Sequence, residues 1–502
     1  MADCPINSAS ETIADFIYRN GSQQQFPGNS EDIPCMDFVS TDFSIIYTPL
    51  DTVEPISLSK FTYYSIPGLY TLLDSSSMDA SGILATHASP ALSNQGRGVI
   101  IGIIDTGIDY TNPLFRNQDG TTRIISIWDQ SLPDDKDNLP DGVPNRYNAS
   151  GATYGTEYIR EQINEALESD NPFAVVPSTD TNGHGTFLAG IAAGGILPNQ
   201  DFTGAAPECE LVIVKLKPAK QYLRDFYLIS NDADAYQEND IMMGIKYLRV
   251  EAYSQRKPLV ILLGIGSNLG SHEGTSPLNV MIQDISRYLG MATVIAAGNE
   301  TGRGHHYMGS VPIGEESVEV EIRVGNAESQ RGFVVELWAD TADTYSVGFV
   351  SPSGESIGRI PIIGRNETSI PFLLEPTVIT VNYQLIETGA GKQLVFIRFE
   401  APTNGIWRIR VYNTQYLTGQ FNMWLPAHTL ISDETVFLTP SPYTTITLPG
   451  DSPSPITVGA YNHLNNSIYI HSGRGYTIGG LIKPDLAAPG VNVSGPSIGQ
   501  RN

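Results

Sequence analysis

The feature that most constrains the fold is a set of short, uninterrupted apolar runs that are rich in β-branched residues. These runs occupy residues 99–104, 211–214, 259–263 and 292–297. Runs of this kind are typical of strands buried on both faces of a parallel sheet. Segments of helical character lie between them, at about 186–194, 235–251 and 278–289. Strands that alternate with helices predict right-handed βαβ crossovers and an α/β fold with a doubly wound, mostly parallel sheet.

The pattern changes at about residue 311, where short strands with alternating apolar and polar residues follow one another. The clearest of them are at 318–324, 333–337, 394–399 and 407–411. Period-two alternation between turn signals favours antiparallel β structure, a sandwich or a jelly roll. Residues 456–460 again have the apolar pattern of a buried strand. We therefore expect an all-β jelly-roll domain inserted into the α/β domain.

Charge and composition exclude several classes of partner. The chain has 54 acidic and 29 basic residues and a formal net charge of −25. Nucleic acid and anionic membrane surfaces repel so negative a chain, and the basic residues form no local patch. No apolar run approaches the roughly 20 residues that a membrane helix needs. We expect no nucleic-acid partner, no membrane partner and, from the polar N-terminus, no secretory signal peptide.

The first candidate site is Asp105-Thr106-Gly107, directly after the first apolar run. Residues just past the carboxyl end of a parallel strand form the ligand crevice of such a sheet. Gly107 allows a tight exit turn, and an ionised Asp105 there could orient a neighbouring imidazole. Aspartic proteases also use Asp-Thr-Gly, but they carry it twice and this chain has one copy. A turn cap is the structural alternative for Asp105.

Two further candidates complete the set. His184 is the one histidine of eight that lies between two glycines at a predicted helix start, and its ordinary pKa near 6.5 suits a general base. Asn299 follows the apolar run at 292–297, where a side-chain amide can donate to a developing oxyanion. A Gly-Asn pair on its own is more often a plain turn.

Together these three sites, in this order, resemble the subtilisin-like serine proteases. Two more segments strengthen the resemblance: residues 204–215, which look like the segment after the family's histidine helix, and 484–491, which look like the segment before its serine. The resemblance covers roughly 83–310 and 440–502. It implies a subtilisin-like fold in which Asp105 orients His184, His184 is the general base, and Asn299 completes the oxyanion hole.

By the same resemblance, Gly264, Ile265 and Gly266 line the primary specificity pocket with extended backbone. A serine often stands at the first of these positions, so Gly264 departs from the family. The family's nucleophile, in Gly-Thr-Ser-x-Ala, is expected on a continuation beyond Asn502. The triplet 274–276 also reads Gly-Thr-Ser, but it precedes Asn299 and lacks the following Ala. We therefore assign no nucleophile within the chain.

Three explanations of the missing serine stay open. The chain is one piece of an active endopeptidase, or one half of a cleaved protein whose halves stay associated, or part of a pseudoprotease that binds or signals. The expected partners are a protein or peptide substrate, the chain's own propeptide and a C-terminal continuation that carries the serine. Residues 440–502 without such a continuation would expose apolar surface.

The inserted β module makes the chain most similar to the Csp-type germination proteases of spore-forming bacteria, among which both active and inactive members occur. The implied boundaries are 1–75 for a short propeptide-like N-terminal segment, 76–310 for the first part of the catalytic domain, 311–430 for the jelly roll and 431–502 for the second part. Propeptide cleavage is expected between about 60 and 82, and a plain N-terminal extension is the alternative. The insert either stiffens the catalytic domain, which we favour, or docks a partner.

The remaining expectations concern cofactors and loops. The sequence predicts no cofactor and no metal; calcium is common in the family, but no oxygen-ligand loop assigns a site. Adjacent His305 and His306 in a Gly-rich loop are expected to be solvent-exposed, and metal binding is the alternative. Residues 117–180 are expected to form surface loops beside the substrate groove. Localisation stays unknown from the residues, and the resemblance implies a spore-associated or extracellular protein.

Overall fold

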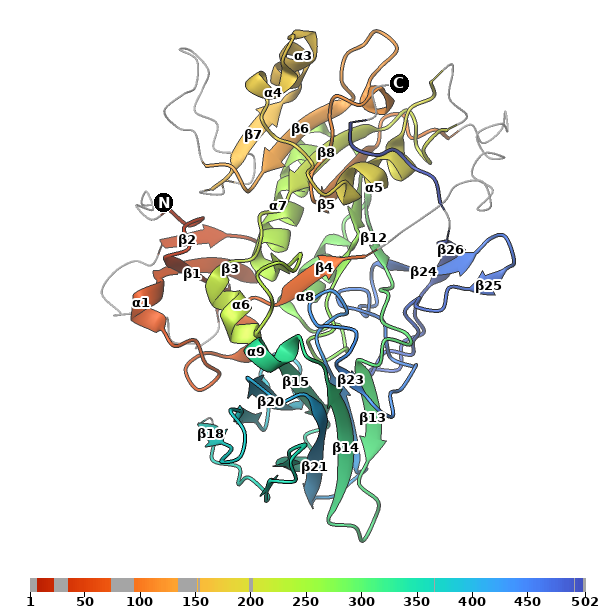
Figure 1. Ribbon diagram of the computed structural model, residues 1–502. Coiled ribbons are helices and arrows are strands. Elements are labelled where there is room, and N and C mark those ends of the chain that lie inside the picture. The colour runs from red at the N-terminus through yellow and green to blue at the C-terminus, as the bar shows by residue number, and fades with distance from the viewer. Residues whose placement is uncertain are drawn as a thin grey trace.

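The computed structural model describes residues 7–21, 35–73, 94–133, 151, 154–197, 202–364, 366–491 and 493–499. At its centre lies a nine-stranded sheet (Figure 1). Its strands are β5 (Ile100–Asp105), β6 (Ile124–Asp129), β7 (Thr156–Ile159), β8 (Glu210–Lys215), β10 (Leu259–Leu263), β12 (Met291–Ala296), β24 (Ile456–Asn462), β25 (Ser467–Ile468) and β26 (Leu486–Pro489). The order is β25-β24-β12-β10-β5-β8-β6-β7, with β26 beside β24. All pairs are parallel except those of β7 and β25, so the sheet is mixed.

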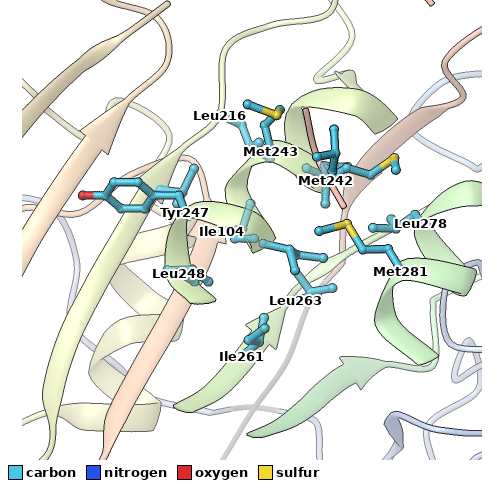
Figure 2. Packing of buried hydrophobic residues seen from close by; sticks show 14 of the residues in the cluster. Ile104, Leu216, Met242, Met243, Tyr247, Leu248, Ile261, Leu263, Leu278 and Met281 are labelled. Carbon is cyan, nitrogen blue, oxygen red and sulfur yellow. The ribbon is translucent and has the colours of Figure 1, made fainter. Parts of the chain in front are cut away.

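Helices cover both faces of this sheet because successive strand residues point to opposite sides. Ile100 and Ile104 of β5 belong to the core shared with α7 (Glu238–Gln255) and α8 (Pro277–Ile285). Figure 2 shows Met242, Met243, Tyr247 and Leu248 around Ile104 on that side. Ile101 and Ile103 belong to the opposite core, with α5 (His184–Ala193) and α3 (Arg160–Glu168). The predicted apolar runs are therefore strands buried on both faces.

The expectation that residues 117–180 form surface loops is wrong for the described part of that range; residues 134–150 and 152–153 lie outside the described residues. β6 is a fully buried strand next to β8, and β7, α3 and α4 (Pro172–Val175) follow it. The strand escaped prediction because Ser126 interrupts its apolar run. Ser126 is buried all the same, since its hydroxyl accepts a hydrogen bond of 2.7 Å from Tyr247 Oη of α7.

Two antiparallel sheets pack against each other between His306 and Phe437, a slightly wider range than the expected 311–430. The six-stranded sheet is β13 (His306–Ser310), β22 (Gln420–Trp424), β15 (Gly332–Ala339), β20 (Gln393–Glu400), β19 (Val378–Gln384) and β18 (Glu367–Pro371), in that order. The five-stranded sheet is β17 (Ser356–Ile357), β16 (Thr344–Val350), β21 (Gly405–Gln415), β14 (Ser317–Val324) and β23 (Val436–Phe437). Side chains of both sheets form one buried cluster. The jelly-roll connection pattern stays a prediction.

The N-terminal segment is built from β1 (Ile13–Arg19), β2 (Cys35–Phe38), β3 (Phe43–Pro49), α1 (Leu50–Val53), the 3-10 turn η1 (Tyr63–Ser65) and β4 (Leu69–Leu72). β1, β3 and β2 form a small antiparallel sheet that shares a core with α7 (Figure 1). A second shared core joins Phe16 and Tyr63 to α6 (Gln221–Tyr227) and to Trp338 of β15. The segment thus packs against both the central domain and the β insert. No helix in the described part of the chain is long and apolar enough to cross a membrane.

A buried ion pair fixes the N-terminal sheet to the start of α6. Lys220 Nζ lies 2.6 Å from Asp15 Oδ1 and donates to the carbonyls of Ser8 and Ile13, and both charged side chains are 1% exposed. Removing one partner of a buried pair leaves the other charge uncompensated in a low-dielectric environment.

We expect Lys220→Met to lower the free energy of unfolding by about 3–5 kcal/mol, because Asp15 stays buried without its cation. Denaturant unfolding of the whole chain measures the loss. The matched control is Arg97→Met, which breaks the exposed Arg97–Glu208 pair and should change nothing measurable. Equal effects of the two substitutions would contradict the buried anchor.

Candidate active site

Three neighbouring strands bring the predicted segments to one edge of the sheet. β5 lies between β8 and β10, and β10 lies between β5 and β12. Because all four are parallel, their carboxyl ends meet at the same edge. Asp105 ends β5, Gly264 follows β10 and Asn299 follows β12. His184 is the first residue of α5, which packs against β5.

Asp105 and His184 are in direct contact. Nδ1 of His184 lies 2.8 Å from Oδ1 of Asp105, and the same oxygen accepts a hydrogen bond of 2.8 Å from the Thr106 amide. Asp105 is 1% exposed, whereas 12% of the His184 side chain is accessible. A buried carboxylate on Nδ1 fixes the ring orientation and leaves Nε2 toward the site.

A buried carboxylate that sequence reasoning missed holds the two loops together. Asp180 Oδ1 accepts from the Thr106 hydroxyl at 2.9 Å and from the Gly183 amide at 2.8 Å, and Oδ2 accepts from the amide and hydroxyl of Thr186. The Thr106 hydroxyl in turn accepts from the Gly185 amide at 2.9 Å. The signal was available, since an Asp just ahead of a helix start is a common cap of the free N–H groups there.

Glycines make this approach sterically possible. A Cβ atom on Gly185 would lie 2.2 Å from the carbonyl oxygen of Gly107. A Cβ atom on Gly264 would lie 2.5 Å from Leu188 Cδ1 and 3.1 Å from His184 Cε1. A side chain at position 264 would therefore meet Leu188 first and also crowd the imidazole of His184.

Strand β4 of the N-terminal segment ends beside His184. It forms an antiparallel three-stranded sheet with β11 (Ile265–Gly266) and β9 (Tyr236–Gln237). At its end the Leu73 amide donates to the Gly264 carbonyl at 2.6 Å, and the Leu73 carbonyl oxygen lies 2.9 Å from His184 Nε2. Both ring nitrogens thus face oxygen acceptors, and hydrogen bonds to both require a proton on each nitrogen.

The side chain of Leu73 points to the pocket that the sequence assigned to Gly264, Ile265 and Gly266. A Cβ atom on Gly266 would lie 2.8 Å from Leu73 Cδ1 and 2.5 Å from Thr447 Oγ1, and one on Gly298 would lie 2.5 Å from Thr447 Cγ2. Thr447 therefore stands between the two glycine walls. Leu73 and Thr447 are residues that no local sequence pattern singled out.

Glu238 fixes the other end of the bound strand. Its Oε2 accepts from the Gly68 amide at 3.3 Å, its Oε1 accepts from the Leu278 amide at 3.0 Å, and its own amide donates to the Gly68 carbonyl at 2.9 Å. Burial raises the pKa of this carboxyl to about 7, although these hydrogen bonds oppose the shift.

The expectation that His305 and His306 are exposed is wrong, because they are 1% and 2% exposed. His305 Nδ1 bonds Glu300, whereas His306 bonds the Tyr443 carbonyl and stacks on Trp424 at 4.8 Å. Histidines next to each other on an extended backbone point to opposite sides, and here both sides are packed.

Ser276 serves the fold. Its hydroxyl bonds both the amide and the side chain of Asn279, and it is the N-cap of α8. No group of three His, Cys, Asp or Glu side chains in the described ranges could hold a metal ion.

Comparisons with known proteins agree with this geometry. A model of the subtilase family matches residues 96–353 and 439–501. The solved structure of the Clostridium perfringens CspB protease is similar with a TM-score of 0.70 and 31% identity, over 84% of this chain and 82% of that chain.

Curated relatives match over shorter stretches. Subtilisin-like protease SBT1.9 of Arabidopsis thaliana is 30% identical over 149 residues, 27% of this chain and 18% of the relative. The PII-type proteinase of Lacticaseibacillus paracasei is 24% identical over 266 residues, 52% of this chain and 12% of the relative. The match thus spans only a small part of each relative. With its subtilisin-like mixed sheet, its additional antiparallel sheets and a family model that matches well over half of its residues, the chain belongs to the subtilase family of serine proteases.

Proposed function

We propose that this chain carries the Asp and His of a serine endopeptidase that hydrolyses peptide bonds through an acyl-enzyme. The observation that carries the proposal is the alignment at His184, which has a buried carboxylate 2.8 Å from Nδ1 and a backbone carbonyl 2.9 Å from Nε2. Once the Leu73 carbonyl leaves Nε2 and that nitrogen gives up its proton, the imidazole held by Asp105 is suited to take a proton from a serine and return it to a leaving amine.

In the proposed mechanism His184 removes the hydroxyl proton of the nucleophile and Asp105 stabilises the imidazolium that forms. The serine attacks the peptide carbonyl, and Asn299 with a backbone N–H near the serine stabilises the tetrahedral oxyanion. The serine would lie on a continuation after Asn502, as the family resemblance implies. Exposed apolar side chains on and near β24–β26 support this proposal, because they offer a surface for a continuation to cover; they include Ile468, Ile470, Tyr476, Ile482 and Leu486.

We further propose that residues 1–75 act as a propeptide that inhibits the enzyme as a bound strand. β4 has the antiparallel pairing with β11 that an extended substrate needs, and the Leu73 carbonyl lies next to His184 Nε2. Leu73 would then supply the acyl group at cleavage. The expected cleavage range of 60–82 includes Leu73, and its part from 74 to 82 lies outside the described residues.

The non-enzymatic alternative, a pseudoprotease that binds a partner, gains no support from the described residues. A chain that served only as a binding module would have no need of the buried carboxylate on His184 or of the glycine walls of the pocket. The nature of the residue at the nucleophile position decides between the two functions.

Labelling of the full-length protein with a fluorophosphonate tests the proposal. We expect one serine adduct, formed at a rate that His184→Ala lowers by roughly 10³-fold or more, because the hydroxyl loses its base. His463→Ala, a histidine on the turn between β24 and β25, is the matched control and should label normally. No adduct on the unaltered protein would favour the pseudoprotease.

The bound strand predicts a particular cut. Self-processing of the full-length protein should yield a new C-terminus at Leu73, detected by intact-mass measurement of both fragments. Leu73→Glu should slow this processing by at least about tenfold, because an ionised carboxylate would be buried against the glycine walls. Processing at a site outside the segment 60–82 would refute the propeptide assignment.

Docking of the N-terminal segment should depend on pH. Glu336 of β15 accepts from Tyr63 Oη at 2.7 Å and from the Gly270 amide and Trp338 Nε1 at 2.9 Å, and burial raises its pKa from 4.5 to about 7. We expect release of the segment to open this carboxyl to water and so to lower its pKa, in which case the docked state binds the proton more tightly. Docking should then weaken as the pH rises through about 7.

Amide hydrogen exchange at residues 63–73, corrected for the intrinsic rate, measures this effect. Protection should fall by roughly tenfold or more across that pH range. Glu336→Gln should flatten the dependence, and adding Glu238→Gln should flatten it further. Asp343→Asn, which removes a buried carboxylate that bonds only within the β insert, is the control. An unchanged pH profile in the double variant would overturn the assignment.

A further inference from the structure

The residue that follows Asn299 is a buried carboxylate with every lone-pair direction in use. Glu300 is 2% exposed. Its Oε2 accepts from Asn268 Nδ2 at 2.8 Å and from His305 Nδ1 at 2.9 Å. Its Oε1 accepts from the amide of His428 at 3.0 Å and from the Nδ1 of His428 at 2.9 Å. Four donors thus converge on one side chain.

These donors come from three segments of the chain. Asn268 lies two residues after the pocket strand β11, His305 directly precedes β13, and His428 follows β22. The chain therefore enters the β insert beside one donor and leaves it beside another. The neighbour of His428, Thr429, bonds the hydroxyl of Thr71 in the bound strand β4. Glu300 joins the insert, the pocket loop and the groove at one point.

The charge of Glu300 makes this junction stiff. Burial alone would raise the pKa of the carboxyl, but the hydrogen bonds and charges of His305 and His428 outweigh it and hold the pKa well below the ordinary value of 4.5. A buried, fully paired carboxylate has strong charge-assisted hydrogen bonds, and a change in any partner would leave a polar group unsatisfied. The backbone at residue 300 is therefore fixed from three sides.

We propose that Glu300 is a positioning residue through which the β insert fixes the oxyanion donor Asn299. The inference rests on the proposed function. Asn299 is the adjacent residue at the end of β12, and a donor aimed at a transition state must be held within about half an ångström of its working position. The insert would then contribute to turnover although it supplies no group to the reaction itself.

A double-mutant cycle on the full-length protein tests this role with a peptide substrate. Glu300→Gln should lower kcat by roughly tenfold to a hundredfold and change KM little, because the oxyanion donor acts in the transition state. In an Asn299→Ala background the same substitution should lower kcat by less than about threefold, because its target is already absent. Full additivity of the two losses, or a loss confined to KM, would overturn the proposal.

His428→Leu keeps the inference testable if Glu300→Gln fails to fold. His428 is partly exposed and its backbone amide remains, so this variant removes one donor of the four; it should show a smaller loss of kcat that also vanishes beside Asn299→Ala. An additive His428 effect would refute the role. Asp343→Asn, which alters a buried carboxylate inside the insert, should leave kcat unchanged. If the unaltered protein neither labels nor turns over, the proposed function itself is wrong. If the unaltered protein is active and the Glu300→Gln variant is equally active, only the positioning role of Glu300 is wrong.

Discussion

The contact between Asp105 and His184 is the interaction on which the rest of the site depends, and it requires two loops to approach more closely than side chains normally allow. Gly185 packs on the backbone of Gly107, and Asp180 ties Thr106 to the start of α5. The sheet order positions the rest of the site: β10 lies next to β5, so the backbone at residues 264–266 reaches the same edge of the sheet. A methyl group at Gly185 would separate the carboxylate from the imidazole while leaving every strand in place.

Buried carboxylates recur at the junctions between parts of this acidic chain. Asp15 meets Lys220 under the N-terminal sheet, Glu238 and Glu336 accept from the N-terminal segment, and Glu300 joins the insert to the pocket loop. Each accepts from donors that belong to a different part of the chain. A carboxylate can accept several hydrogen bonds at once. An apolar residue in its place would leave the buried donors without an acceptor. These hydrogen bonds therefore fix the relative positions of the parts more precisely than their shared apolar cores do.

Local patterns in the sequence predicted the strands β5, β8, β10 and β12 and the positions of Asp105 and His184, because each depends on a short run of residues. Prediction failed where the burial or position of a residue is determined by contacts with residues distant in sequence. Ser126 is buried in β6 because Tyr247 on a distant helix bonds it. His305 is buried because Glu300 and the end of the insert surround it. The position of Leu73 depends on β11 and His184, which are about 110 to 190 residues away in sequence. No periodicity within residues 63–73 could predict contacts with residues so distant.

The bound strand β4 and the β insert contact the same few residues, and these shared contacts affect how the N-terminal segment would be released. Glu336 holds Tyr63 of the N-terminal segment and the Gly270 amide of the pocket loop with different oxygens. If residues 1–75 are released as proposed, this carboxylate loses the Tyr63 hydroxyl, whereas its bond to the Gly270 amide involves its other oxygen. A tethered strand also has a high effective concentration and excludes substrate even when its own affinity is modest. Under the proposed inhibition, cutting the tether therefore matters more than weakening the contacts of the bound strand.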